Sequence, residues 1–216
     1  MRTPKPPRSF WFARVVRVVL GVPLKAAYRV TLRGAENLPA TGGVILAGNH
    51  VSYADPILLW CRSPRPVHFM ARADLWEHNI VGWGLDHLWS FPVRRAAADR
   101  EALSRASDLL QGGEVVGIFP AGSRFAAEGE SHGGAAFLSI RNNIPVVPIG
   151  IAGTEKILPR GARLPHFPRV TISAGDAIDP AQFTQGGRKE RVEAMTNEIM
   201  ARISEQVELS RKAADR

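Results

Sequence analysis

Residues 44–60, which read VILAGNHVSYADPILLW, decide the fold. The first four residues are all apolar, as in a strand that is buried on both faces, and residues 57–60 look like the first turns of a helix. A strand followed by a helix is the repeating unit of an α/β domain. Because ligands bind at the carboxyl ends of the strands in an open α/β sheet, the polar residues between these two segments predict a functional site.

The rest of the chain repeats this pattern. Further apolar runs at 67–70, 115–119, 146–149 and 170–172 alternate with helical stretches, such as residues 99–111 between the capping residues Asp99 and Gly112. The last predicted helix starts near Gly187 and carries apolar residues at helical spacing: Val192, Met195, Ile199, Ile203 and Val207. We therefore predict a mostly parallel central sheet flanked by helices, formed by one domain over residues 30–216.

The composition excludes several classes of protein. The chain has 216 residues, of which 45% are hydrophobic and 22% charged, so collagen, coiled coils and disordered chains are excluded. Cys61 is the only cysteine, which excludes an internal disulfide and a paired-cysteine metal or redox site and favours a location that faces the cytoplasm. The five histidines other than His50 show no metal-ligand spacing, so we expect neither a metal nor a cofactor.

The excess charge lies in the N-terminal arm, residues 1–29. The formal net charge is +8, and residues 1–34 hold eight basic and no acidic residues, which leaves 20 of each in the remainder. Arg14, Arg17 and Lys25 fall within roughly 80° of one another on a helical wheel, opposite a wide apolar face. The longest charge-free apolar run, residues 18–24, is too short to cross a bilayer. We predict an amphipathic helix, broken or kinked at Pro23, that lies on an anionic membrane surface.

The arm also has other interpretations. The helix could simply pack on the domain with its arginines in solvent. A secretory signal peptide is disfavoured because Arg14 and Arg17 interrupt the apolar region. Nucleic acid is a weaker candidate partner than a membrane, because the rest of the chain is neutral and contains no recognised nucleic-acid-binding module.

The polar residues between the first strand and helix could carry chemistry. His50 can accept a proton from a hydroxyl at neutral pH, and Asp55 could hold its other ring nitrogen. This pair corresponds to the base and the orienting acid of a serine triad, without the serine. In the alternative interpretation Asp55 caps a helix in which Pro56 occupies the first position.

Two further segments suit the binding of a phosphate group. Arg94 and Arg95 follow the strand-like residues 90–93, and Gly122, Ser123 and Arg124 follow the apolar run at 115–119. Arginine matches phosphate oxygens with two parallel hydrogen bonds, and glycine allows the backbone to come close. The alternative is that each arginine is an ordinary solvated charge.

Taken together, these segments resemble the glycerolipid acyltransferase superfamily over residues 30–181. The matching motifs follow the family's order: Asn49, His50 and Asp55 for N-H-x-x-x-x-D, residues 91–95 for the arginine motif, residues 119–124 for F-P-E-G-T-R, and residues 144–149 for the apolar V-P-V-V-P-V run. The resemblance implies that His50 and Asp55 are catalytic and that the substrates contact Asn49, Arg94, Arg95, Gly122, Ser123 and Arg124. It also implies that a fatty acyl group passes from acyl-CoA or acyl carrier protein to a lysophospholipid, above all 1-acyl-glycerol-3-phosphate, at the cytoplasmic side of the cell membrane.

The third motif departs from the family pattern. Ala121 stands where the family has glutamate, Ser123 replaces threonine, and Phe125 replaces a common serine. The missing carboxylate could orient the arginine or contact the acceptor, whereas His50 and Asp55 are intact, so we predict an active enzyme with an altered acceptor, such as another lysolipid or a glycolipid. An acyl-CoA thioesterase and a non-catalytic lipid-binding protein remain alternatives.

Overall fold

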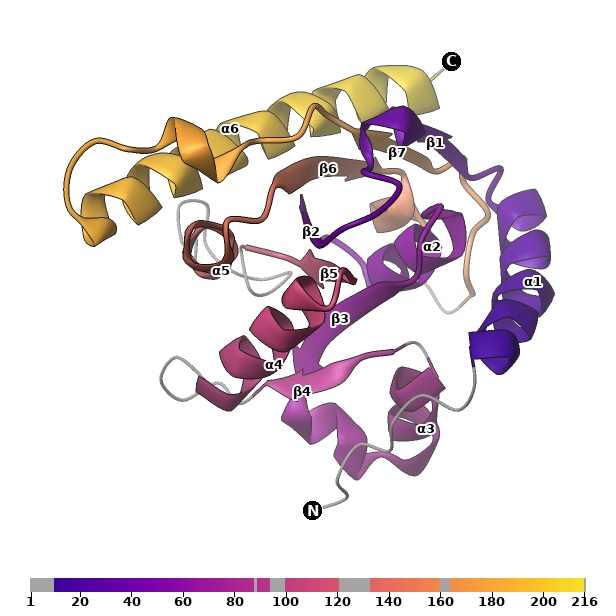
Figure 1. The fold of residues 1–216 in the computed structure, drawn as a ribbon. Helices are drawn as coiled ribbons and strands as arrows, with labels where there is room; N and C mark the ends of the chain where they lie inside the picture. Colours follow the sequence, from indigo (N-terminus) through magenta and orange to yellow (C-terminus); the bar gives the residue numbers. More distant parts are fainter. Residues whose placement is uncertain (1–9, 88, 94–99, 121–132, 160–163, 216) are drawn as a thin grey trace.

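The computed structural model describes residues 10–87, 89–93, 100–120, 133–159 and 164–215 (Figure 1). Seven strands form one sheet in the order β1-β7-β6-β2-β5-β3-β4. The strands are β1 (Thr31–Arg33), β2 (Val44–Gly48), β3 (Val67–Arg72), β4 (Phe91–Val93), β5 (Val115–Ile118), β6 (Val146–Ala152) and β7 (Thr171–Ala174). The helices are α1 (Phe10–Ala27), α2 (Ala54–Arg62), α3 (Asn79–His87), α4 (Arg100–Gln111), α5 (Gly134–Asn142) and α6 (Arg188–Ala214), with short 3-10 turns η1 (Ala35–Asn37), η2 (Ala73–Glu77), η3 (Thr154–Lys156) and η4 (Pro180–Gln182).

The sheet is mostly parallel, as the sequence predicted. Neighbouring strands run parallel throughout, except for β6 and β7, which are antiparallel. Because β2, β5, β3 and β4 are parallel neighbours, their carboxyl ends all lie at one edge of the sheet. That edge is where the loop after β2 begins.

Helices cover both faces of the sheet, which explains why the strands are apolar without alternation. Val44 and Leu46 of β2 belong to the core on the side of α1 and α2, whereas Ile45 and Ala47 belong to the core on the side of α4, α5 and α6. Figure 1 shows these two groups of helices on opposite sides of the sheet. Helix α6 begins after Gly187 as predicted, and it buries Met195, Ile199 and Ile203.

Helix α1 packs against α2, as the alternative interpretation predicted. It continues through Pro23 to Ala27, so the predicted break is absent. A Cβ atom on Gly21 would lie 3.5 Å from the Cβ atom of Cys61, which shows how closely the two helices approach. Arg17 is half-buried on this same side, and burial lowers its pKa. Arg17 is therefore not simply solvated, which corrects that part of the alternative interpretation.

The side of α1 that faces away from the domain carries an apolar stripe. Four exposed valines recur there at helical spacing, Val15, Val18, Val19 and Val22, and Leu20 and Lys25 of this helix are exposed as well. In the part of the chain that the structure describes, no helix is both long and apolar enough to cross a membrane.

Candidate active site

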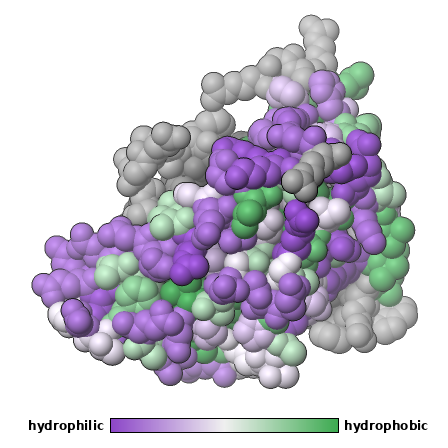
Figure 2. Space-filling view, turned by 90° about the horizontal axis from the view of Figure 1, so that it is seen from above, coloured by the Kyte–Doolittle hydropathy of each residue, from purple (hydrophilic) through white to green (hydrophobic). Residues whose placement is uncertain are grey.

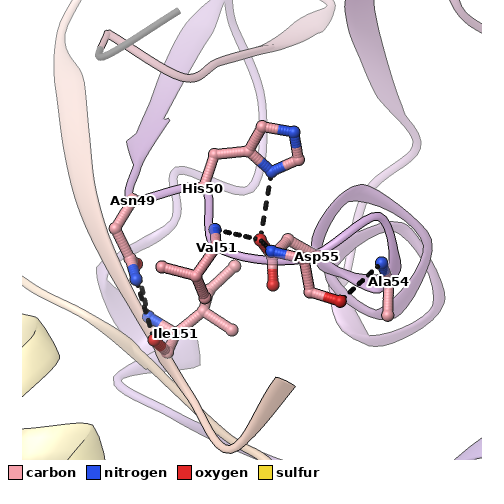
Figure 3. Close-up of polar contacts among 7 residues, drawn as sticks. Asn49, His50, Val51, Ala54, Asp55 and Ile151 are labelled. Atoms are coloured by element: carbon pink, nitrogen blue, oxygen red, sulfur yellow. Dashed lines mark hydrogen bonds and ion pairs between the residues drawn. The ribbon is translucent and has the colours of Figure 1, made fainter. Parts of the chain in front are cut away.

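The loop between β2 and α2 is organised around one carboxylate oxygen. Asp55 Oδ2 accepts hydrogen bonds from the backbone N–H groups of Val51 and Ser52, both at 2.7 Å, and lies 3.0 Å from His50 Nδ1 (Figure 3). The Ser52 hydroxyl in turn accepts from the N–H of Ala54 at 3.3 Å. Three donors on one oxygen hold the loop in one form and tie the histidine ring to it at Nδ1.

Asp55 does not cap α2, so that alternative is wrong. The helix begins at Ala54, and Asp55 is its second residue. Its carboxylate points back to the loop that precedes the helix, because the N–H groups it accepts belong to earlier residues. The side chain is fully buried, and its second oxygen, Oδ1, has no hydrogen-bond partner among the described residues.

The remaining ring nitrogen of His50 is available for chemistry. A carboxylate accepts hydrogen bonds, so the N–H group at Nδ1 donates a hydrogen bond to Asp55, and Nε2 carries the free electron pair. Figure 3 shows Nε2 on the side of the ring away from Asp55. The His50 side chain is 18% exposed, so a hydroxyl from outside can reach it. The arrangement is that of a general base held in one tautomer by a buried acid.

A phenylalanine packs against the flat face of this base. The ring centroids of His50 and Phe119 lie 4.4 Å apart, with an angle of 18° between the ring planes. Phe119 directly follows β5, the neighbour of β2 in the sheet. The sequence placed Phe119 in a motif but did not predict this contact, because only the strand order brings the ends of β2 and β5 together.

Asn49 joins the site to the strand on its other side. Its amide donates to the carbonyl oxygen of Ile151 at 2.9 Å and accepts from the N–H of Ile151 at 2.7 Å. Both bonds reach into β6, so the side chain extends the pairing of β2 and β6 by one residue beyond Gly48. Asn49 therefore anchors the residue next to the base, and its contact with a substrate stays a prediction.

The predicted phosphate-binding residues lie outside the described residues: Arg94, Arg95, Gly122, Ser123 and Arg124. The described residues that precede them, Val93 at the end of β4 and Pro120 after β5, lie at the same edge of the sheet as His50. The sequence predictions for these five residues stay predictions.

Comparisons with known proteins agree with this geometry. A family model described as "Acyltransferase" matches residues 29–152, more than half of the chain. A 1-acyl-sn-glycerol-3-phosphate acyltransferase of Bacillus subtilis is 30% identical over 177 residues, which cover 82% of this chain and 87% of the relative. A chloroplast 1-acyl-sn-glycerol-3-phosphate acyltransferase of Arabidopsis thaliana is 29% identical over 140 residues, which cover 62% of this chain and 39% of that protein.

A solved structure has a similar fold. The crystal structure of the 1-acyl-sn-glycerophosphate acyltransferase of Thermotoga maritima matches with a TM-score of 0.65 and 22% sequence identity, over 90% of this chain and 81% of that one. The match to the family model includes the loop with His50 and Asp55, and the match to the B. subtilis relative extends across most of the chain. The assignment therefore does not rest on the fold alone. The chain belongs to the acyltransferase family.

Proposed function

We propose that this O-acyltransferase moves a fatty acyl group from acyl-CoA or acyl carrier protein to the free hydroxyl of 1-acyl-glycerol-3-phosphate, giving phosphatidic acid. The observation that carries the proposal is the hydrogen-bonded pair of His50 and Asp55 at the carboxyl end of β2. The acceptor comes from the names of the relatives, which are 1-acyl-sn-glycerol-3-phosphate acyltransferases.

The proposed reaction needs only these two side chains for proton transfer. Nε2 of His50 takes the proton of the acceptor hydroxyl while the hydroxyl oxygen attacks the thioester carbonyl carbon. Asp55 stabilises the positive charge that then forms on the ring, since its buried carboxylate already contacts Nδ1. When the tetrahedral intermediate collapses, the C–S bond breaks and the ring returns the proton to the leaving sulfur. The products are the ester and a free thiol, and the reaction consumes no metal or redox cofactor.

The acceptor phosphate needs cations near this base. Arg95 and Arg124 are the residues that we propose for it, with Arg94, Gly122 and Ser123 beside them, because guanidinium groups bind phosphate oxygens in pairs. The described parts of β4 and β5 lead toward the edge of the sheet that carries His50, which supports this assignment.

A membrane surface is the proposed partner of α1. The outward valines Val18, Val19 and Val22 are 62%, 62% and 63% exposed, which is unusual for a helix whose other side packs on the domain. Figure 2 shows hydrophobic residues along the right-hand edge of the molecule, the side on which α1 lies in Figure 1. The acceptor and the product both reside in a bilayer, so an enzyme held at its surface meets them directly.

A second apolar segment lies beside the end of α1. Leu158, Leu164 and Phe167 are 61%, 75% and 57% exposed. The Phe167 ring packs on Tyr28, with 5.4 Å between the centroids, and the Phe167 carbonyl oxygen accepts from the guanidinium of Arg29 at 3.0 Å. These contacts hold Phe167 next to the end of α1, and we propose that the bilayer that covers α1 also covers these three exposed side chains.

Thiol release from palmitoyl-CoA tests the proposed reaction. We expect release by the wild-type protein to require 1-acyl-glycerol-3-phosphate and to fall at least a hundredfold in His50→Ala, since general-base catalysis contributes roughly 10²–10⁴-fold. Release without acceptor identifies a thioesterase instead. Near-normal turnover by His50→Ala refutes the assignment of the base, and the assay is repeated with an acyl carrier protein thioester to cover the second donor.

Flotation with vesicles of phosphatidylglycerol and phosphatidylethanolamine tests the membrane partner. Val18→Asp places a charge in the outward stripe of α1 and should abolish flotation. Leu209→Asp is the matched control, since Leu209 lies on α6 and is 48% exposed. Equal flotation of both variants refutes the proposed contact.

A further inference from the structure

Three planar side chains form a continuous stack that ends at the base. His50 lies against Phe119, and Phe119 lies against Phe69, with 5.8 Å between their centroids and 6° between their planes. His50 follows β2, Phe119 follows β5, and Phe69 lies in β3. Since β2, β5 and β3 are consecutive in the sheet, the stack crosses three neighbouring strands.

The far end of the stack is held rigidly. Phe69 is 3% exposed and belongs to the hydrophobic core, whereas Phe119 is only partly buried at the edge of that core. Phe69 pairs with Gly117 of β5 across the sheet. A Cβ atom on Gly117 would lie 2.3 Å from Cε1 of Phe69, so only glycine leaves room for the ring in this position.

Asp55 alone does not fix the direction of Nε2. Its hydrogen bond at Nδ1 restrains one edge of the imidazole, but the ring could still tilt about that contact. A flat ring against the face of the imidazole prevents such a tilt. The same face also attracts the imidazolium that forms when His50 takes a proton, because an aromatic face is negative.

We propose that Phe69 is a positioning residue, which acts through Phe119 to hold His50 in the orientation required for proton transfer. Gly117 serves this purpose by leaving space for the Phe69 ring. The inference rests on the proposed function of His50 as the base. Phe69 touches no substrate in this scheme, so it should affect turnover and leave substrate binding unchanged.

Phe69→Leu is the test variant, and Ile199→Val is its matched control. Ile199 is 2% exposed on α6, in the core on the opposite face of the sheet, so its replacement also removes buried apolar surface. Both variants should unfold at a lower temperature. Only Phe69→Leu should lower kcat, by roughly tenfold, with the KM values of both substrates unchanged, since small displacements of reacting groups are costly.

Histidine-selective NMR detects the stacking of Phe119 on His50 through the chemical shift of the His50 ring, independently of turnover. The face of Phe119 shifts the ring signal of His50 upfield, and the signal is identified by its loss in His50→Gln. We expect Phe69→Leu to reduce this shift, Ile199→Val to keep it, and Phe69→Tyr, which retains the ring, to restore both the shift and kcat.

The two readouts separate failure of this inference from failure of the proposed function. A Phe69→Leu protein with an unchanged His50 signal refutes the positioning role. A changed signal with unchanged kcat refutes any role of the stack in turnover, whereas full activity of His50→Ala refutes the base itself and leaves the NMR result intact. If Phe69→Leu does not fold, Phe69→Met fills more of the buried space without a flat ring, and the same outcomes apply.

Discussion

Replacing Asp55 by asparagine separates the charge of this residue from its shape. The two side chains have the same size, so the loop after β2 should keep its form. In a serine triad the same replacement costs about 10⁴ in kcat because the histidine adopts the wrong tautomer. We expect a smaller loss here, for a reason that the loop provides.

The backbone determines which atom of the asparagine faces His50. The N–H groups of Val51 and Ser52 both point at the Oδ2 position from 2.7 Å, so the amide oxygen must occupy it. His50 Nδ1 then still donates to an oxygen, and the tautomer is kept. The variant loses only the negative charge opposite the imidazolium. At a separation of about 4 Å and an effective dielectric constant near 20, that attraction is about 4 kcal/mol, or roughly 10³ in rate.

The stability change should be smaller than the change in rate. Each hydrogen bond to the charged oxygen weakens by about 1 kcal/mol when the acceptor becomes neutral, and removal of a buried charge offsets part of this loss. The NH₂ group takes the place of Oδ1, which has no partner among the described residues, and this adds a small cost. We expect the free energy of unfolding to fall by about 1–2 kcal/mol.

Thiol release with saturating substrates and urea unfolding measure both quantities. Asp179→Asn is a matched control, because Asp179 also accepts a backbone N–H, that of Ala181, but caps the distant turn η4. It should leave kcat unchanged. A loss below tenfold in Asp55→Asn shows that no positive charge develops on His50. A loss of 10⁴ or more shows that the tautomer has changed, and either result refutes the reasoning.

Three further predictions concern Asn49, His68 and Ala121. Asn49→Ala leaves the N–H and C=O groups of Ile151 unpaired and should lower the free energy of unfolding by about 2 kcal/mol, as measured in urea; an unchanged midpoint contradicts the anchoring role. Burial lowers the pKa of His68 to about 4, so the unfolded chain binds more protons than the folded protein between pH 6.5 and pH 4. The free energy of unfolding should therefore fall by about 3 kcal/mol as the pH is lowered through this range, and titration of His68 should not change it further below pH 4. His68→Phe, which keeps a ring beside Trp89, should remove this dependence; an identical pH profile of unfolding contradicts it. Ala121→Glu should alter the preference among lysolipid acceptors more than the rate with the preferred one, and identical acceptor profiles count against the predicted role of this position.

The strands and the pairing of His50 with Asp55 were predictable because local patterns determine them. Apolar runs gave β2, β3, β5, β6 and β7, and the spacing of His50 and Asp55 gave the pair. The strand β1 was not predicted, since three residues reading TLR carry too little apolar pattern. The roles of Phe119 and Asn49 were not predictable either. They depend on β5 and β6 lying on the two sides of β2, and the strand order is set by packing of residues about 70 to 100 positions away.

The orientation of α1 shows what a helical wheel leaves open. The wheel gives two different faces, but it does not say which one meets the protein. Here Gly21 allows close approach to α2, and Leu24 joins the core, so the side that also carries Arg17 turns inward. The valine stripe is left outside, where it contributes nothing to folding. This orientation supports the proposed contact of α1 with a membrane surface.

The small area of the valine stripe limits the free energy that it alone can contribute to membrane binding. A fully buried valine side chain contributes about 1.5 kcal/mol, so covering the exposed part of Val15, Val18, Val19 and Val22 contributes roughly 3–4 kcal/mol. Such a free energy corresponds to a dissociation constant near 1 mM, which is too weak for lasting attachment. The exposed side chains of Leu164 and Phe167 contribute a similar increment. If both segments contact the bilayer, Phe167→Asp should weaken vesicle binding about as strongly as Val18→Asp, and an unaffected Phe167→Asp protein means that contacts outside the segment supply the remaining affinity.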